Sequence, residues 1–232
     1  MEFKAVLAAR RSVRQFASEA VPEAVIRRAL EDALLAPNSS NMQPWEFYWV
    51  RTPSSKAKLV EACFSQAAAR TAAELVVAVA RTDTWRRNRA LLLEKLASEG
   101  PVPAYLTNYY RKVVPAAYWQ DPFGLAGLLK RIFFGVVGLW RPVPRGPSTR
   151  AELVEVVTKT TALACENFML SVVDQGYASC PMEGFDEKRV KRLLGLGRAS
   201  RVVMVFGVGR AAKAPAPSTH VRLASELFLH EV

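Results

Sequence analysis

The stretch Ala151–Gln175 constrains the fold more than any other part of the chain. Its central sequence, VEVVTKTTALACENFMLSVV, is apolar on most faces of a helix, and Gly176 follows it as a typical helix end. A helix that is apolar on most faces needs other elements packed around it. We therefore predict a long, central and well-buried helix here.

Apolar runs elsewhere predict strands. LVVAVA (75–80) and RVVMVFGV (201–208) are continuous enough to be buried strands, while EFYWV (46–50) and 177–180 predict shorter ones. The other predicted helices span 2–9, 22–36, 54–69 with Ser54 as cap, 86–99, and a segment capped by Asp186 that ends near Leu194. Strands and helices do not alternate as regular βαβ units, which favours an α+β fold.

Length and composition exclude several classes of protein. The 232 residues, half of them hydrophobic, predict a folded chain of one large or two small domains rather than a disordered one. The N-terminus lacks the apolar core of a signal peptide. The sequence has no uninterrupted run of about 18 apolar residues, so a membrane-spanning helix is not expected. Cys63, Cys165 and Cys180 form no C-x-x-C pair, so a reducing cytoplasm is the simplest expectation.

The net charge of +11 is unevenly distributed. Residues 101–150 carry seven cationic side chains against Asp121 alone, a net +6, and also half of the 14 prolines. We interpret this segment as an insertion with its own character. The charge admits nucleic acid, an anionic membrane surface or a phosphorylated ligand as a partner.

Four short motifs carry residues suited to ligand chemistry. Arg10-Arg11-Ser12-Val13-Arg14 places guanidinium groups around a hydroxyl, which suits a phosphate. Residues 37–45 (PNSSNMQPW) form a polar loop before a strand, residues 181–186 (PMEGFD) follow a strand, and His220 and Arg222 form a basic pair in the tail. Taken singly, each motif also fits an ordinary solvated segment or connection.

Together the four motifs resemble the nitroreductase-like FMN oxidoreductases. R-R-S-x-R-x-F, A-P-N-S-S-N-x-Q-P-W, P-M-E-G-F-D and the terminal basic pair occur in register over about 1–90 and 151–232. The resemblance implies a three-layer α+β fold, with a central, mostly antiparallel sheet flanked by helices. It also implies one FMN-binding domain over 1–232, and an intertwined homodimer with FMN at the subunit interface.

The resemblance assigns a role to each motif residue. The FMN phosphate, ribityl chain and pyrimidine edge would be bound by Arg10, Arg11, Ser12 and Arg14, and Arg222 with His220 would complete the phosphate site. Many family members have lysine where His220 stands, so a permanent charge is not expected there. Ser40 and Asn41 would contact the flavin from the partner subunit. Gln66 would bind the isoalloxazine edge, and Glu183 and Gly184 would lie along the ring, with the Gly184 N–H near N5.

The chemistry implied is hydride transfer through the flavin, so no catalytic side chain and no metal site is predicted. NAD(P)H would reduce FMN and leave before a flat oxidised acceptor, such as a nitroaromatic or a quinone, enters the same cleft. No G-x-G-x-x-G follows a strand, so nicotinamide would not occupy a Rossmann domain. The alternative hypotheses are a flavin-binding or storage protein without turnover, and a peripheral membrane quinone reductase. Nucleic-acid binding is not expected.

The insertion admits two interpretations. Residues 125, 128, 129, 132, 133, 136, 137 and 140 are apolar at helical spacing, beside Lys130, Arg131 and Arg141. The segment would be a lid or a dimer arm that packs against the partner subunit. Alternatively, its apolar face within 123–141 would admit a hydrophobic acceptor or dock on an anionic membrane.

Overall fold

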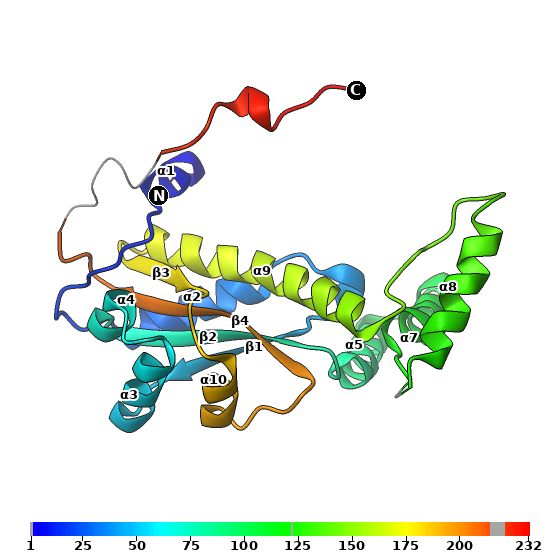
Figure 1. Cartoon of the computed structure of the whole chain (residues 1–232), viewed down its shortest axis with the longest axis horizontal. Coiled ribbons are helices and arrows are strands. Elements are labelled where there is room, and N and C mark those ends of the chain that lie inside the picture. The colour runs from blue at the N-terminus through cyan, green and yellow to red at the C-terminus, as the bar shows by residue number, and fades with distance from the viewer. Residues whose placement is uncertain (1, 122, 214–220) are drawn as a thin grey trace.

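A sheet lies between two layers of helices in the computed structural model, which describes residues 2–121, 123–213 and 221–232 (Figure 1). The described residues form one four-stranded sheet, in which every neighbouring pair is antiparallel. Its strands, in the order β1-β2-β4-β3, are β1 (Trp45–Val50), β2 (Glu74–Arg81), β4 (Ser200–Gly209) and β3 (Ala178–Met182). The predicted antiparallel sheet is confirmed.

The alternation of side chains along β2 explains the two helical layers. Val76, Ala78 and Ala80 face a core shared with α2 (Glu23–Leu34) and α9 (Arg150–Asp174). The intervening residues, Leu75, Val77 and Val79, face a second core with α3 (Pro53–Ala62), α4 (Ala67–Thr71) and α10 (Glu187–Leu193). Because both faces of β2 are covered, its sequence is continuously apolar.

The predicted central helix is confirmed as α9. It packs against α2 and crosses β2, β3 and β4, and α2 and α9 lie on the same side of the sheet (Figure 1). Its N-terminus has a capping box, in which the Thr149 side chain accepts from the backbone N–H of Glu152 and the Glu152 carboxylate accepts from that of Thr149. Phe168 is fully buried, whereas Leu163 on the other face is 46% exposed.

Two predicted elements are wrong in detail. The expected helix over 54–69 is two helices, α3 and α4, because Phe64 and Ser65 adopt left-handed backbone angles between them, and Thr52 rather than Ser54 caps α3. The strand predicted to stop at Cys180 continues through Pro181 to Met182. A proline is tolerated there because β3 lies at the edge of the sheet, and its outer side is bridged, among the described residues, only near Ser179, by Ser12 and Val13.

The segment after α5 (Trp85–Glu99) leaves the layered body. It forms α6 (Ala104–Asn108), the π-helical turn η2 (Tyr109–Val113), α7 (Val114–Tyr118) and α8 (Leu125–Val137), and we call residues 101–149 the arm. Figure 1 shows α7 and α8 beyond one end of the sheet. No helix among the described residues is long and apolar enough to cross a membrane.

Candidate flavin site

The predicted basic motif lies along the first residues of β3. Ser12 pairs with Ser179 in a parallel bridge, and the backbone N–H of Val13 donates to the Ser179 carbonyl at 3.1 Å. Val13 itself is buried and Arg14 is exposed, as alternation in an extended segment requires. The motif that follows α1 (Phe3–Ala9) is therefore anchored to the sheet through its backbone, which leaves side chains available.

The arginines of this motif differ in their partners. Within the described residues, the guanidinium groups of Arg10 and Arg14 make no hydrogen bond and no ion pair. The Arg11 guanidinium instead turns back and donates to the carbonyls of Ala8 and of Arg10, the latter at 2.8 Å. Arg11 thus satisfies carbonyls at the end of α1, and Arg10 and Arg14 remain as cations without a carboxylate.

Gln66 and Gly184 meet although they are 118 residues apart. The Gln66 Nε2 donates to the Gly184 carbonyl at 2.9 Å, and also to the Cys63 carbonyl at 3.2 Å. Gly184 and Glu183, just past β3, are exposed. The Gly184 N–H has no acceptor within the described residues. This contact brings together two of the predicted site residues at the exit of β3.

A buried hydroxyl that the sequence did not single out lies next to the basic motif. Ser179 is 1% exposed, and its Oγ has no hydrogen-bond partner within the described residues. Beside it, burial raises the pKa of the Cys180 thiol, and the positive charge of Arg14 partly opposes that increase. Arg14 therefore acts electrostatically at β3, beside an unpaired buried donor.

Ser40 and Asn41 belong to a turn with unusual backbone angles. The turn η1 (Ser39–Asn41) and the following Gln43 include three non-glycine residues with left-handed φ values: Ser40 at 58°, Asn41 at 53° and Gln43 at 45°. Each such residue typically costs about 1–3 kcal/mol. Strain of this kind persists only where the surroundings hold the backbone in place.

Two tyrosines of the arm hold this turn. The Tyr109 hydroxyl lies 2.7 Å from Ser40 Oγ, and the Tyr118 hydroxyl donates to the Ser39 carbonyl at 3.2 Å. Tyr118 is buried, and this burial raises its pKa, so the hydroxyl stays protonated as a donor. Sequence reasoning missed this role, since the contacts cross about 70 to 80 residues of chain.

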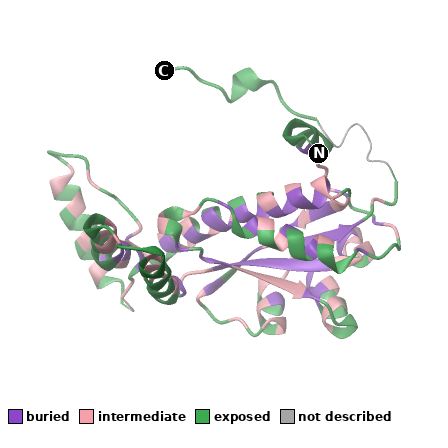
Figure 2. Ribbon diagram, turned by 180° about the vertical axis from the view of Figure 1, so that it is seen from behind, coloured by how far each residue is buried: buried purple, intermediate pink, exposed green. Residues whose placement is uncertain are grey.

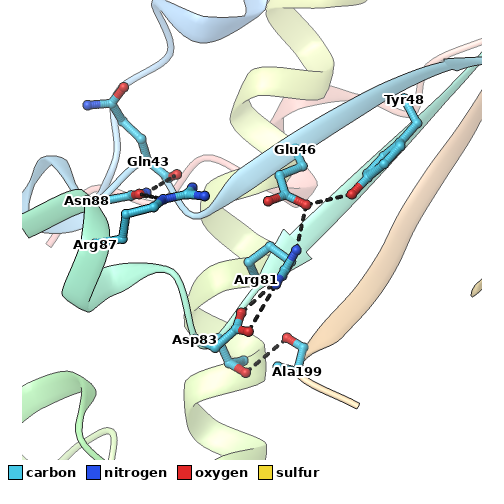
Figure 3. A network of polar contacts seen from close by, with 9 residues as sticks. Gln43, Glu46, Tyr48, Arg81, Asp83, Arg87, Asn88 and Ala199 are labelled. Carbon is cyan, nitrogen blue, oxygen red and sulfur yellow. Dashed lines mark hydrogen bonds and ion pairs between the residues drawn. The ribbon is translucent and has the colours of Figure 1, made fainter. Parts of the chain in front are cut away.

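The body holds the other side of the turn. Asn88 Nδ2 donates to the Met42 carbonyl at 2.8 Å and to the Gln43 carbonyl at 3.1 Å, and Figure 3 shows the contact with Gln43. Figure 3 also shows Arg81, whose guanidinium binds Glu46 at 2.7 Å and Asp83 at 3.0 Å across the ends of β1 and β2. The Arg81 guanidinium lowers the pKa of Asp83. Asn88 therefore holds the backbone after the turn, and the Arg81 ion pairs join the neighbouring strand ends.

The strand register places the two groups of predicted residues at opposite ends of the sheet. Trp45, which follows the turn, pairs with Ala80 of β2, whereas Ser179 pairs with Val208, which in turn pairs with Glu74. Ala80 and Glu74 are six residues apart, or about 20 Å along the strand. Within one chain, Ser40 and Asn41 are therefore separated from Ser12 and Arg14.

Of the two predicted tail residues, the structure describes Arg222 alone. His220 lies outside the described residues. Arg222 is exposed, and its guanidinium donates to its neighbour's carbonyl, that of Val221, at 3.0 Å. Figure 1 shows residues 221–232 extending away from the layered body, beyond α1. The structure does not bring Arg222 to the basic motif.

A cavity of about 600 Å³ lies elsewhere, at the base of the arm. Trp85, Tyr118, Phe123, Arg150 and Arg198 are among the residues that line it, and none of the predicted flavin-site residues does. This cavity is therefore separate from the predicted flavin site.

Comparison with known proteins agrees with this arrangement of motifs. The family model described as "Nitroreductase family" matches residues 7–210, which is most of the chain. The chain belongs to the nitroreductase family. The match runs through the arm and includes Arg10, Ser12, Ser40, Gln66 and Gly184.

Relatives of this family member carry oxidoreductase names. A Thermus thermophilus protein named NADH dehydrogenase is 27% identical over 230 residues, covering 96% of this chain and 93% of the relative. Bacillus subtilis YdgI, provisionally named an NAD(P)H nitroreductase, is 23% identical over 214 residues, covering 91% and 89%.

A solved structure shows the same fold. The Exiguobacterium sibiricum protein, crystallised in complex with FMN, is 22% identical and superposes with a TM-score of 0.75, covering all of this chain and 98% of its own. The three-layer arrangement around an antiparallel sheet is therefore the nitroreductase fold.

Proposed function

We propose that the protein is an FMN-dependent oxidoreductase that passes hydride from NAD(P)H to a flat oxidised acceptor, such as a nitroaromatic or a quinone, by a ping-pong mechanism. The observation that carries the proposal is the set of unpaired donors along β3. Four donor groups have no acceptor within the described residues: the guanidinium groups of Arg10 and Arg14, the Ser179 hydroxyl and the Gly184 N–H. Ser12 adds a further hydroxyl beside Ser179. These donors fit a ligand with a phosphate dianion at one end and a polar ring edge at the other.

The residues of the chain bind and orient the cofactor. Arg10 and Arg14 would offset the negative charge of the phosphate and donate hydrogen bonds to it and to the pyrimidine edge. The hydroxyls of Ser12 and Ser179 would donate further hydrogen bonds to the same groups. Arg222, with His220, would add a further cation once the tail folds back. FMN supplies the hydride transfer when it is bound.

The exit of β3 would position the ring. Gln66, fixed by the Gly184 carbonyl, presents its amide to the ring edge. The exposed Gly184 lets the ring approach its backbone, because no side chain stands there. Glu183 would lie along the same edge. No side chain of the chain is required as a nucleophile.

We further propose a homodimer in which the whole chain is one FMN-binding domain with an insertion over about 101–150. Ser40 and Asn41 lie about 20 Å along the sheet from the end that carries Ser12 and Ser179. A second chain would bring its own Ser40 and Asn41 to this end. Each site would then combine the β3 surface of one chain with the turn of its partner.

The proposal is tested first by spectroscopy. The purified protein should bind FMN, measured by absorbance and by titration after flavin removal, and NADH or NADPH should bleach the flavin without oxygen. Quinone and nitroaromatic acceptors should then restore the colour. Failure to bind FMN contradicts the proposal, while binding without bleaching by either nucleotide favours the flavin-storage alternative.

Variants locate the site. Arg10→Ala and Arg14→Ala should each weaken FMN binding about 10- to 100-fold, because each removes a charge-assisted contact worth about 1.5–3 kcal/mol. Arg192→Ala, which removes an exposed arginine of α10, is the matched control and should bind as the parent does. Equal affinity in all three variants would remove this surface from the site.

Mixed dimers test the shared site. Arg14→Glu and Asn41→Asp should each impair FMN binding in a pure dimer. Unfolding and refolding the two variants together should recover binding, because each mixed dimer contains one site free of both changes. No recovery, with mixed dimers confirmed by mass spectrometry, would show that the site lies within one chain.

A further inference from the structure

The helix α8 presents its apolar side to solvent. Its six exposed large apolar residues fall within an arc of about 140° when the chain turns about 100° per residue, whereas the half-buried Phe134 and Val137 lie outside that arc. The six include Leu125 at 63%, Leu129 at 67% and Phe133 at 58% exposure, and they continue into Trp140 at 77%. Figure 2 shows the arm largely exposed, in contrast to the buried sheet.

The opposite side of α8, which carries small and polar residues together with the half-buried Phe134, is held against the rest of the chain. A Cβ at Gly127 would lie 2.0 Å from the Ser148 carbonyl oxygen, so the helix and residues 141–149 are in close contact. Lys130 Nζ donates to the carbonyls of Ala116 and Pro147 at 2.9 and 2.8 Å, and Arg131 forms an ion pair with Glu152. These contacts turn the apolar side outwards, the reverse of an ordinary surface helix.

The arm that carries this apolar side also carries an excess of positive charge. Arg111, Lys112, Arg141 and Arg145 of the arm are exposed and form no ion pair within the described residues. The single carboxylate of residues 101–149, Asp121, accepts hydrogen bonds from backbone N–H groups at the start of α8 and does not offset them. The arm therefore combines an uncovered apolar strip with uncompensated cations.

We propose that the arm docks on an anionic lipid bilayer, with α8 lying flat in the headgroup region. Thirteen residues make a helix of about 20 Å, which is too short to span a bilayer but long enough to lie along it. Leu125, Leu129, Phe133 and Trp140 would enter the acyl boundary, and the basic residues would remain with the lipid phosphates.

Charge favours a bilayer over a second copy of the chain as the occupant. The cores of protein interfaces are depleted of charged residues, especially lysine, whereas the arm that carries the apolar strip of α8 has a net positive charge. Each copy carries the same excess over 101–150, so pairing two arms would bring like charges together. An anionic bilayer offers acyl chains to the apolar strip and phosphate groups to the cations of the arm.

Vesicle flotation tests the proposal directly with the full-length protein. The protein should float with vesicles of phosphatidylcholine containing about one-third phosphatidylglycerol, and should remain below with phosphatidylcholine alone. Raising the salt concentration should weaken flotation. Absence from both lipid fractions, or equal flotation with both, would overturn the proposal.

A pair of variants locates the docking surface. Leu129→Glu combined with Phe133→Glu should lower vesicle binding at least about tenfold, because two inserted side chains become charged. Leu35→Glu is the matched control: Leu35 is 79% exposed at the end of α2, outside the arm, and should leave binding unchanged. Undiminished flotation of the arm variant would contradict the proposal.

The oligomeric state in solution shows whether a second copy of the chain, rather than a bilayer, covers α8. Light scattering should find the same subunit number in the parent and in the arm variant, with circular dichroism unchanged because both residues are exposed. If the parent does not float and the arm variant loses subunits, a second copy covers α8 and the bilayer proposal is wrong.

Discussion

The helices α9 and α8 are both rich in apolar residues, but the structure uses them in opposite ways. Phe168 of α9 is fully buried between the sheet and α2, with its ring 4.9 Å from that of Phe206. Phe133 of α8 is 58% exposed. The difference lies in the neighbours: α9 crosses a sheet, while the contacts of α8 among the described residues are with α7, the returning segment and the start of α9.

This contrast shows that an apolar pattern predicts a helix but not its environment. Helical spacing defines a face, and the residues on the other face decide which way the helix turns. In α8 the close approach at Gly127 fixes that orientation, and in α9 the apolar residues on several faces leave no polar side to expose. Four predictions test the contrast, from the largest expected effect to the smallest.

Replacing Phe168 of α9 or Phe133 of α8 by alanine should change the free energy of unfolding by very different amounts. Phe168→Ala should lower the free energy of unfolding by about 3–5 kcal/mol, because it leaves a cavity in a closed core. Phe133→Ala should change it by no more than about 0.5 kcal/mol, because its ring is mostly in solvent. Urea denaturation of both variants measures the difference, and similar losses would show that α8 is covered in solution.

Gly127→Ala should destabilise the arm by about 1–3 kcal/mol, since the new methyl group meets the Ser148 carbonyl. Gly135→Ala, in the same helix, has no atom within 4 Å of the added carbon and should stabilise the helix by up to about 1 kcal/mol. Hydrogen exchange across 125–137 measures both changes. Equal protection in the two variants would contradict the packing of α8.

Tyr109→Phe should loosen the connection between the arm and the turn η1. Loss of the contact with Ser40 should cost about 0.5–1.5 kcal/mol, seen as faster hydrogen exchange at 39–43. If the turn contacts the flavin, FMN affinity should fall by up to about tenfold. Tyr105→Phe, which alters an exposed tyrosine of α6, is the control and should have neither effect.

The pH dependence of stability should reveal the contribution of the Arg81–Asp83 ion pair near the turn η1. Arg81 lowers the pKa of Asp83 in the folded state, so the pair stabilises the fold above the unfolded pKa of aspartate. That contribution is lost as pH falls through the lower folded pKa. Because the Asp83 side chain is 48% exposed, Asp83→Asn should remove at most about 1 kcal/mol; the loss should be full above about pH 4 and should shrink as the pH falls below it. A melting-temperature difference that persists unchanged at pH 2–3 would contradict this origin.

Local sequence patterns predicted much of the fold. The continuous run of β2, the length of α9 and the Asp186 cap of α10 all agree with the structure, because burial and capping depend on nearby residues. The break between α3 and α4 was missed, since it depends on left-handed angles at Phe64 and Ser65, which no glycine marks.

The candidate site was predicted unevenly for the same reason. Ser12 and Gly184 were predicted from motifs and Gln66 from the family resemblance; the structure pairs Ser12 with Ser179 of β3 and joins Gln66 to Gly184 at the exit of this strand. Ser179 was missed because an isolated serine in a strand carries no local signal of burial. Arg11 was named with Arg10 and Arg14, yet its guanidinium turns back to the end of α1.

The sequence by itself determined the nitroreductase motifs, the order of most elements and the concentration of charge over 101–150. These follow from residue types and short spacings, which local chemistry controls. Only the tertiary structure decided that Ser40 lies at the other end of the sheet from Ser12, that arm tyrosines hold the turn η1, and that α8 faces outwards. Each of these depends on strand register or on contacts between distant segments, and the order of residues alone does not specify which segments meet.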